Sequence, residues 1–123
     1  MEEGDLFDWA ELMERMDDDL ELLQRMLALF RRDYPALLDD AHQAIAAGDA
    51  RALHNATHTL KGMLGNLSAH PAVQIAQKLE GINPRENAQE AEEKFQALET
   101  CAEHLSQALN AAFARAQGGE TQN

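Results

Sequence analysis

The stretch LELLQRMLALFRRDYPALLDDAHQAIAAGD, residues 20–49, decides the fold class of this chain. Its apolar residues recur at steps of three and four, the repeat of one face of an α-helix. This stripe comprises Leu20, Leu23, Leu27, Phe30, Tyr34, Leu37, Ala41 and Ile45. Its phase continues across Pro35, so we expect one long helix with a kink rather than two helices. Gly48 is typical of a residue that ends a helix, and Asp49 of the N-cap of the next.

The segments on either side of this helix are amphipathic as well, and the connections between them are short. We expect helices over residues 6–16 after an N-cap at Asp5, over 50–67, from Pro71 to about Gly81, and from a capping-box-like start at Asn83–Glu86 to about Gln117. Short connections favour antiparallel neighbours. The expected fold is therefore all-α: an antiparallel up-down four-helix bundle with an additional N-terminal helix that caps one end.

The length of 123 residues, with 45% hydrophobic residues, predicts one domain with a modest core. We expect the bundle to occupy residues 1–117. The polar residues 118–123 are typical of a flexible tail.

The charge of the chain excludes several classes of partner. Acidic residues outnumber basic ones 22 to 10, which gives a formal net charge of -12 and argues against nucleic acid and anionic membrane surfaces. The longest apolar run, residues 26–30, is far too short to span a membrane, and the acidic N-terminus does not resemble a signal peptide. The single cysteine, Cys101, cannot form an internal disulfide. We expect a cytoplasmic protein.

The segment HNATHTLKGMLG, residues 54–65, departs from ordinary helix design. On a helical wheel of about 100° per residue, His58 lies roughly 140° from the centre of the apolar stripe, so it should face solvent. That stripe comprises Leu53, Thr57, Leu60, Leu64 and Leu67. Lys61 follows His58 one turn later and is its neighbour on the helix surface.

Two glycines, Gly62 and Gly65, lie on the surface beside His58. Each costs roughly 1 kcal/mol of helix stability relative to alanine. A surface position chosen for stability alone would hold a better helix former. The glycines therefore indicate that another molecule approaches the His58 imidazole closely.

The chemistry of His58 and Lys61 fits phosphoryl transfer. Neutral imidazole is a nucleophile that can form a covalent intermediate. A phosphoryl group on it would add roughly -1.5 to -2 charges, so a cation at Lys61 would be useful in so acidic a chain.

The sequence His58-Thr59-Leu60-Lys61-Gly62, followed by Gly65-Asn66-Leu67 and Ala69, resembles the signature of histidine-containing phosphotransfer (HPt) domains. The likeness extends over about residues 5 to 115. It includes the long helix through Pro35, the Gly48-Asp49 turn, and Leu79-Glu80 at the end of the following helix.

The resemblance implies a phosphorelay intermediate of two-component signalling, without kinase activity of its own. His58 would accept a phosphoryl group from a receiver-domain aspartyl phosphate and pass it to another receiver aspartate. Lys61 would steady the phosphoryl group, while His54, Gly62 and Gly65 would belong to the docking surface. The partners would be response-regulator receiver domains, including that of a hybrid sensor kinase, and they would supply the Mg²⁺. The chain itself would be a monomer that needs no cofactor.

The sequence departs from the family pattern at several positions. Thr57 stands where the family often has alanine, Met63 and Leu64 stand where small residues are common, and Ser68 replaces a frequent glycine. None of these changes removes the nucleophile or its cation. Met63 is the change that bears on which receiver docks.

Two alternatives remain open from the sequence. The chain could be a non-catalytic module that docks a receiver without using His58. It could also be a metal-binding bundle, because His54 and His58 are four residues apart on a helix. Two imidazoles make an incomplete site, since zinc usually takes four ligands. An acidic residue from another helix would be needed, and the spacing of the acidic residues points to none, so we expect no metal site.

Overall fold

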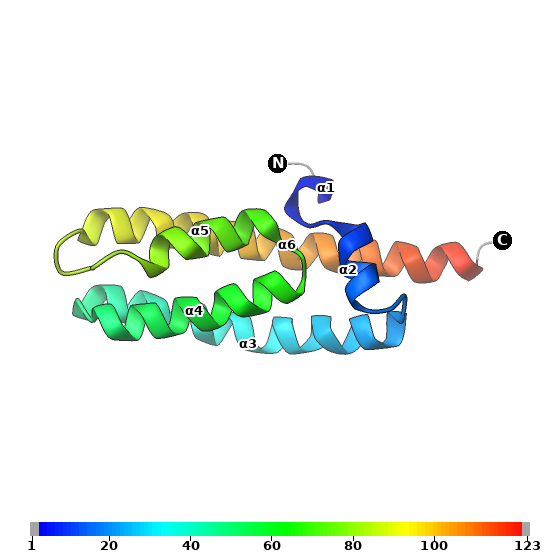
Figure 1. Cartoon of the computed structure of the whole chain (residues 1–123), viewed down its shortest axis with the longest axis horizontal. Coiled ribbons are helices and arrows are strands. Elements are labelled where there is room, and N and C mark those ends of the chain that lie inside the picture. Colours follow the sequence, from blue (N-terminus) through cyan, green and yellow to red (C-terminus); the bar gives the residue numbers. More distant parts are fainter. Residues whose placement is uncertain (1–2, 122–123) are drawn as a thin grey trace.

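The computed structural model describes residues 3–121 of the chain, and the side chains of residues 4–118. Within this range the chain is entirely helical, without a strand, which confirms the all-α prediction (Figure 1). The helices are α1 (Glu3–Leu6), α2 (Trp9–Arg15), α3 (Leu20–Ala47), α4 (Ala50–Asn66), α5 (His70–Glu80) and α6 (Ala88–Thr121).

The four longer helices form the bundle. Both α3 and α5 pack against α4 and α6, so the four make a closed ring around one core. In Figure 1 successive helices run in opposite directions, from α3 through α6, as the short connections favour. The centre of the core consists of fully buried leucines and one phenylalanine, among them Leu23, Phe30, Leu53, Leu60, Leu64, Leu79, Leu98 and Leu105.

Local capping sets the boundaries of α3 and α4. The Asp19 carboxylate accepts hydrogen bonds from the backbone N–H groups of Glu21 and Leu22, at 3.0 and 3.1 Å. Helix α3 then continues unbroken through Pro35, as the phase of its apolar stripe predicted. It ends at Gly48, whose φ of 67° lies in the left-handed region, and Asp49 caps α4 by accepting from the Ala52 N–H.

The prediction of one N-terminal helix starting after Asp5 is wrong. The chain forms two short helices, and the N-cap of the second is Asp8, which accepts from the Glu11 N–H at 3.0 Å. The break arises from a tertiary contact: the Asp8 N–H donates to the Ser68 carbonyl between α4 and α5, at 3.0 Å. Helix α1 packs on α5 and α6 and buries Leu6.

The predicted boundaries of the last helix are also wrong. Asn83 does not start it but closes a separate turn, in which its side-chain oxygen accepts from the Arg85 N–H at 3.0 Å. Helix α6 begins at Ala88, and the Asn87 carbonyl accepts the first helical hydrogen bond from Ala91, at 3.0 Å. At the other end α6 continues to Thr121 instead of stopping near Gln117.

The later end of α6 has a physical reason. Gly118 does not take the left-handed conformation that would end a helix, and each further helical residue adds a backbone hydrogen bond. Residues 118–121 are therefore helical rather than a tail, while 122–123 lie outside the described residues. No helix in the described range combines the length and the apolar character that a bilayer crossing requires.

Candidate functional site

His58 lies midway along α4 with 64% of its side chain exposed. The opposite face of the same helix is buried in the bundle through Leu53, Thr57, Leu60 and Leu64. The outward orientation predicted from the helical wheel is confirmed. Because the imidazole is exposed, a second macromolecule can reach it. The buried face of the helix meanwhile fixes the backbone that carries it.

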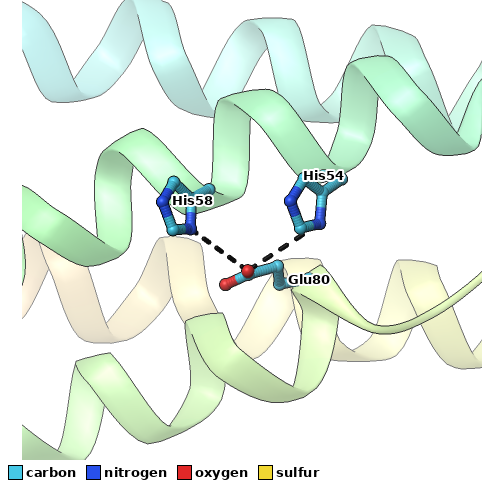
Figure 2. Close-up of side chains that lie close together, drawn as sticks. All are labelled: His54, His58 and Glu80. Carbon is cyan, nitrogen blue, oxygen red and sulfur yellow. Dashed lines mark hydrogen bonds and ion pairs between the residues drawn. The ribbon is translucent and has the colours of Figure 1, made fainter.

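Glu80, on the last turn of α5, lies below His58, and its carboxylate contacts the imidazole (Figure 2). Its Oε1 atom is 3.2 Å from His58 Nδ1 and 3.7 Å from Nδ1 of His54, one turn earlier on α4. The Glu80 side chain is only 13% exposed. Figure 2 shows the carboxylate placed between the two imidazoles, facing both.

The second carboxylate oxygen of Glu80 is paired with Lys61. The ammonium nitrogen lies 2.7 Å from Oε2, and the Lys61 side chain is 26% exposed. Oε2 is buried and lacks a donor at a good hydrogen-bond angle, but opposite charges at this distance form an ion pair. Lys61 and, to a smaller degree, His58 hold the pKa of Glu80 below its usual value, against the opposing effect of burial. Glu80 is therefore ionised at neutral pH.

An ionised carboxylate fixes the tautomer of His58. It can only accept hydrogen bonds, so the neutral imidazole must carry its proton on Nδ1, where it donates to Glu80. The lone pair is then on Nε2. Within the described part of the chain, Nε2 of His58 has no hydrogen-bond partner. Nε2, the nitrogen that does not face Glu80, therefore carries the lone pair and can act as a nucleophile.

His54 lies beside His58 as the sequence predicted, and it is 53% exposed. The two rings are nearly parallel, 9° apart in plane, with their centroids separated by 5.6 Å. The 3.7 Å between His54 Nδ1 and Glu80 is longer than a hydrogen bond. The His54 ring is therefore not held by Glu80. Because both side chains are more than half exposed, either ring can rotate without disturbing the core.

Gly62 and Gly65 are not required by packing inside the bundle. A Cβ atom added at either position would meet nothing within 4 Å, and neither residue has a positive φ. The fold would therefore accept alanine at both positions. The missing side chains leave free space beside His58, as expected for a surface that a partner approaches.

Sequence reasoning missed Glu80 as a member of this site. Leu79-Glu80 belonged to the resemblance only as the end of a helix, and nothing in the sequence distinguished Glu80 from the other 21 acidic residues as a partner of His58. The geometry of the α4–α5 hairpin, which turns at Ser68, could have identified Glu80 as a neighbour of His58. His58 is ten residues before this turn and Glu80 twelve residues after it, about 15 and 18 Å along their helices, so the two lie at nearly the same height.

Comparisons with known proteins place the chain in a family. The model of the Hpt domain family matches residues 25–115. The sensor protein EvgS of Escherichia coli (strain K12) is 31% identical over 90 residues, which cover 73% of this chain but 7% of the relative's length. No solved structure matches. Because the family match covers most of the chain and includes the whole of α4 and α5, the chain belongs to the family of Hpt domains, the phosphotransfer modules of two-component signalling.

Proposed function

We propose that the chain is a phosphorelay intermediate in which Nε2 of His58 accepts a phosphoryl group from an aspartyl phosphate on a receiver domain and passes it to an aspartate of another receiver. The observation that supports this most directly is the Nδ1 contact with Glu80, 3.2 Å long, on an imidazole that is 64% exposed. This contact leaves the lone pair on the outward nitrogen before any partner arrives.

The transfer balances without a further reactant. The Nε2 lone pair attacks phosphorus, so an N–P bond forms while the P–O bond to the receiver aspartate breaks and the aspartate leaves as a carboxylate. The Nδ1 proton stays in place, so the imidazole ring becomes cationic. Glu80, at 3.2 Å, stabilises that cation. Reversal of the same steps transfers the group to the next receiver.

Lys61 has a double role in this proposal. Its ammonium forms an ion pair with Glu80 on one side and has three N–H donors. These donors and the flexible stem allow it to contact a phosphoryl oxygen on His58, one turn away. It would thus steady the phosphoryl group while it orients Glu80.

The docking surface comprises His54, His58, Gly62 and Gly65 on α4, with the adjoining face of α3. Beyond Gly62 a groove of about 240 Å³ lies between these helices, lined in part by Leu29, Met63 and Asn66. Leu29 is 45% exposed, so the groove offers apolar contact to a receiver. Since the same surface must release one receiver and bind another, we expect a small, transient interface.

The proposed role includes a cofactor requirement, an oligomeric state and a compartment. The receiver brings its own acidic pocket and Mg²⁺, so the chain needs no cofactor for transfer. It acts as a monomer in the cytoplasm, where response-regulator receivers, including that of a hybrid sensor kinase, would meet it.

A small phosphoramidate donor tests the proposal without any knowledge of the partners. The wild-type chain, His58→Gln and the matched control His104→Gln, an exposed histidine on α6, are treated and measured by intact mass at neutral pH and after acidification. We expect one acid-labile phosphoryl group on the wild type and the control, and none on His58→Gln. NMR of the product should place it on Nε2. Equal modification of all three chains, or of none, would contradict the proposal and favour a docking module that does not use His58.

A further inference from the structure

We propose that His54, His58 and Glu80 form a binding site for a divalent transition-metal ion such as Zn²⁺, and that the bound metal prevents His58 from accepting a phosphoryl group. From the sequence the two imidazoles made an incomplete site, and no metal was expected there. The structure supplies the missing third ligand from α5. The consequence for phosphorylation rests on the proposed role of His58, whereas metal binding itself does not.

The geometry of the three ligand atoms suits one metal ion. Both imidazoles present Nδ1 to the same carboxylate oxygen, at 3.2 and 3.7 Å, and the potential ligand atoms all lie within 4.8 Å of one another. Two ligands of a tetrahedral zinc ion lie roughly 3.3 Å apart, given metal–ligand bonds of about 2.0 Å. The two distances to Glu80 Oε1 are close to this value. The exposed rings can close the remaining difference by rotation.

The chemistry of the site selects the class of ion. Two imidazoles and a carboxylate are typical ligands of zinc and its neighbours in the first transition row, whereas Mg²⁺ and Ca²⁺ prefer oxygen alone. Lys61 holds Glu80 Oε2 at 2.7 Å, which turns Oε1 toward the imidazoles. A net charge of -12 favours any cation. Three protein ligands leave a fourth position open to water.

Metal binding and phosphoryl acceptance require opposite tautomers of His58. With Glu80 as partner, Nδ1 carries the proton and Nε2 has the lone pair. A metal bound at Nδ1 takes the lone pair of that nitrogen, so the proton of the neutral ring must be on Nε2. The nitrogen that would attack phosphorus then has no lone pair. The metal can therefore inhibit transfer while leaving the outer face of the imidazole uncovered.

The binding experiment uses the full chain after treatment with a chelator, titrated with Zn²⁺ in a calorimeter. We expect one zinc per wild-type chain, and an affinity at least about tenfold lower in His54→Gln and in Glu80→Gln. His104→Gln, which changes an exposed histidine on α6, should bind as the wild type does. Circular dichroism checks that each variant is folded. If the wild type binds no zinc, or if His54→Gln binds it unchanged, the site does not exist.

The inhibition experiment repeats phosphoramidate labelling with and without saturating Zn²⁺. We expect zinc to reduce labelling of the wild-type chain at least tenfold and to leave His54→Gln unaffected, because that variant keeps the nucleophile but lacks one metal ligand. Zinc that binds but does not slow labelling would overturn the inhibitory role. If the wild type is not labelled even without zinc, the proposed phosphorelay function fails, while the calorimetric result still decides whether the metal site exists.

Discussion

The ammonium nitrogen of Lys61 lies 2.7 Å from Oε2 of Glu80, and this ion pair joins the middle of α4 to the last turn of α5. It holds a mostly buried carboxylate below His58 with its other oxygen free to accept from Nδ1. In the proposed function Lys61 would therefore act on His58 in two ways: as a cation one turn away, and as the residue that orients Glu80. The predictions for the site follow from this arrangement.

Removal of the cation should weaken the fold. Lys61→Met leaves the Glu80 carboxylate mostly out of water without its partner, and we expect the free energy of unfolding to fall by about 1–2 kcal/mol, less than for a fully buried pair. The double variant Lys61→Met/Glu80→Gln should recover part of this loss. Urea denaturation measures each value, with Lys78→Met, an exposed lysine on α5, as control. A Lys61→Met chain as stable as the control would show that the pair contributes nothing.

Loss of the carboxylate should slow phosphorylation of His58. Glu80→Gln removes the charge that favours a proton on Nδ1 and stabilises the cationic phosphoimidazole. We expect labelling by phosphoramidate to be about tenfold slower, equivalent to roughly 1.4 kcal/mol, the size of a hydrogen bond to a charged group. Nitrogen-15 NMR of His58 should show a smaller share of the Nδ1–H tautomer. Glu99→Gln, an exposed change on α6, is the control, and equal rates in the two variants would refute the role of Glu80.

Substitution of Gly62 and Gly65 should change the free energy of unfolding and the docking of a receiver in different ways. Gly62→Ala and Gly65→Ala should each raise the free energy of unfolding by about 0.5–1 kcal/mol, because the added Cβ meets no atom within 4 Å. Labelling by the small donor should stay unchanged. Transfer from a phosphorylated receiver, measured by loss of label from the receiver, should be slower in the bulkier Gly62→Gln. Ala114→Gln places a glutamine on an exposed face of α6, and an equal effect there would argue against a docking role for Gly62.

Replacement of the buried Thr57 hydroxyl should stabilise the fold. The threonine side chain is 1% exposed in the core, and its hydroxyl oxygen has no hydrogen-bond partner. Thr57→Val keeps the shape and removes the unpaired polar group, so we expect the free energy of unfolding to rise by about 1 kcal/mol. Thermal and urea denaturation test this. A decrease in stability would mean that the hydroxyl has a partner in solution, such as a bound water.

The contact of α2 with the α4–α5 turn should be lost in acid. Glu11 pairs with His70 Nε2 at 3.1 Å and accepts from the Ser68 hydroxyl at 3.0 Å. His70, and then Ser68, hold the pKa of Glu11 below its ordinary value of 4.5. Its contribution to stability is therefore complete above that value and is lost as the pH falls through the lower pKa of the folded state.

The pH dependence of urea denaturation tests this contact below neutral pH. Glu11→Gln should show less loss of stability in the acid range than the wild type, and the control Glu14→Gln, an exposed change on the same helix, should resemble the wild type. Parallel curves for the wild type and Glu11→Gln would contradict the prediction.

Relationships within one helix could be read from the sequence. The 3.6-residue repeat places Leu53, Leu60 and Leu64 on one side of α4 and His58 on the other, whatever the rest of the fold does. For the same reason Gly62 and Gly65 were expected beside His58, and the capping residues Gly48 and Asp49 marked the α3–α4 turn. These features depend on neighbours a few residues apart, which a helix holds at known angles.

Relationships between helices were decided by tertiary packing. Glu80 became part of the site because the α4–α5 hairpin sets it at the height of His58, and the N-terminal helix was split because Asp8 bonds to Ser68 across the molecule. The start of α6 at Ala88 likewise depends on how the Asn83 turn closes. The sequence by itself thus determined α3 and α4, the exposed imidazole and its glycine-lined surface, since rotation along one helix is local. Only the tertiary structure decided which carboxylate lies below that imidazole, because that choice depends on how two helices pack.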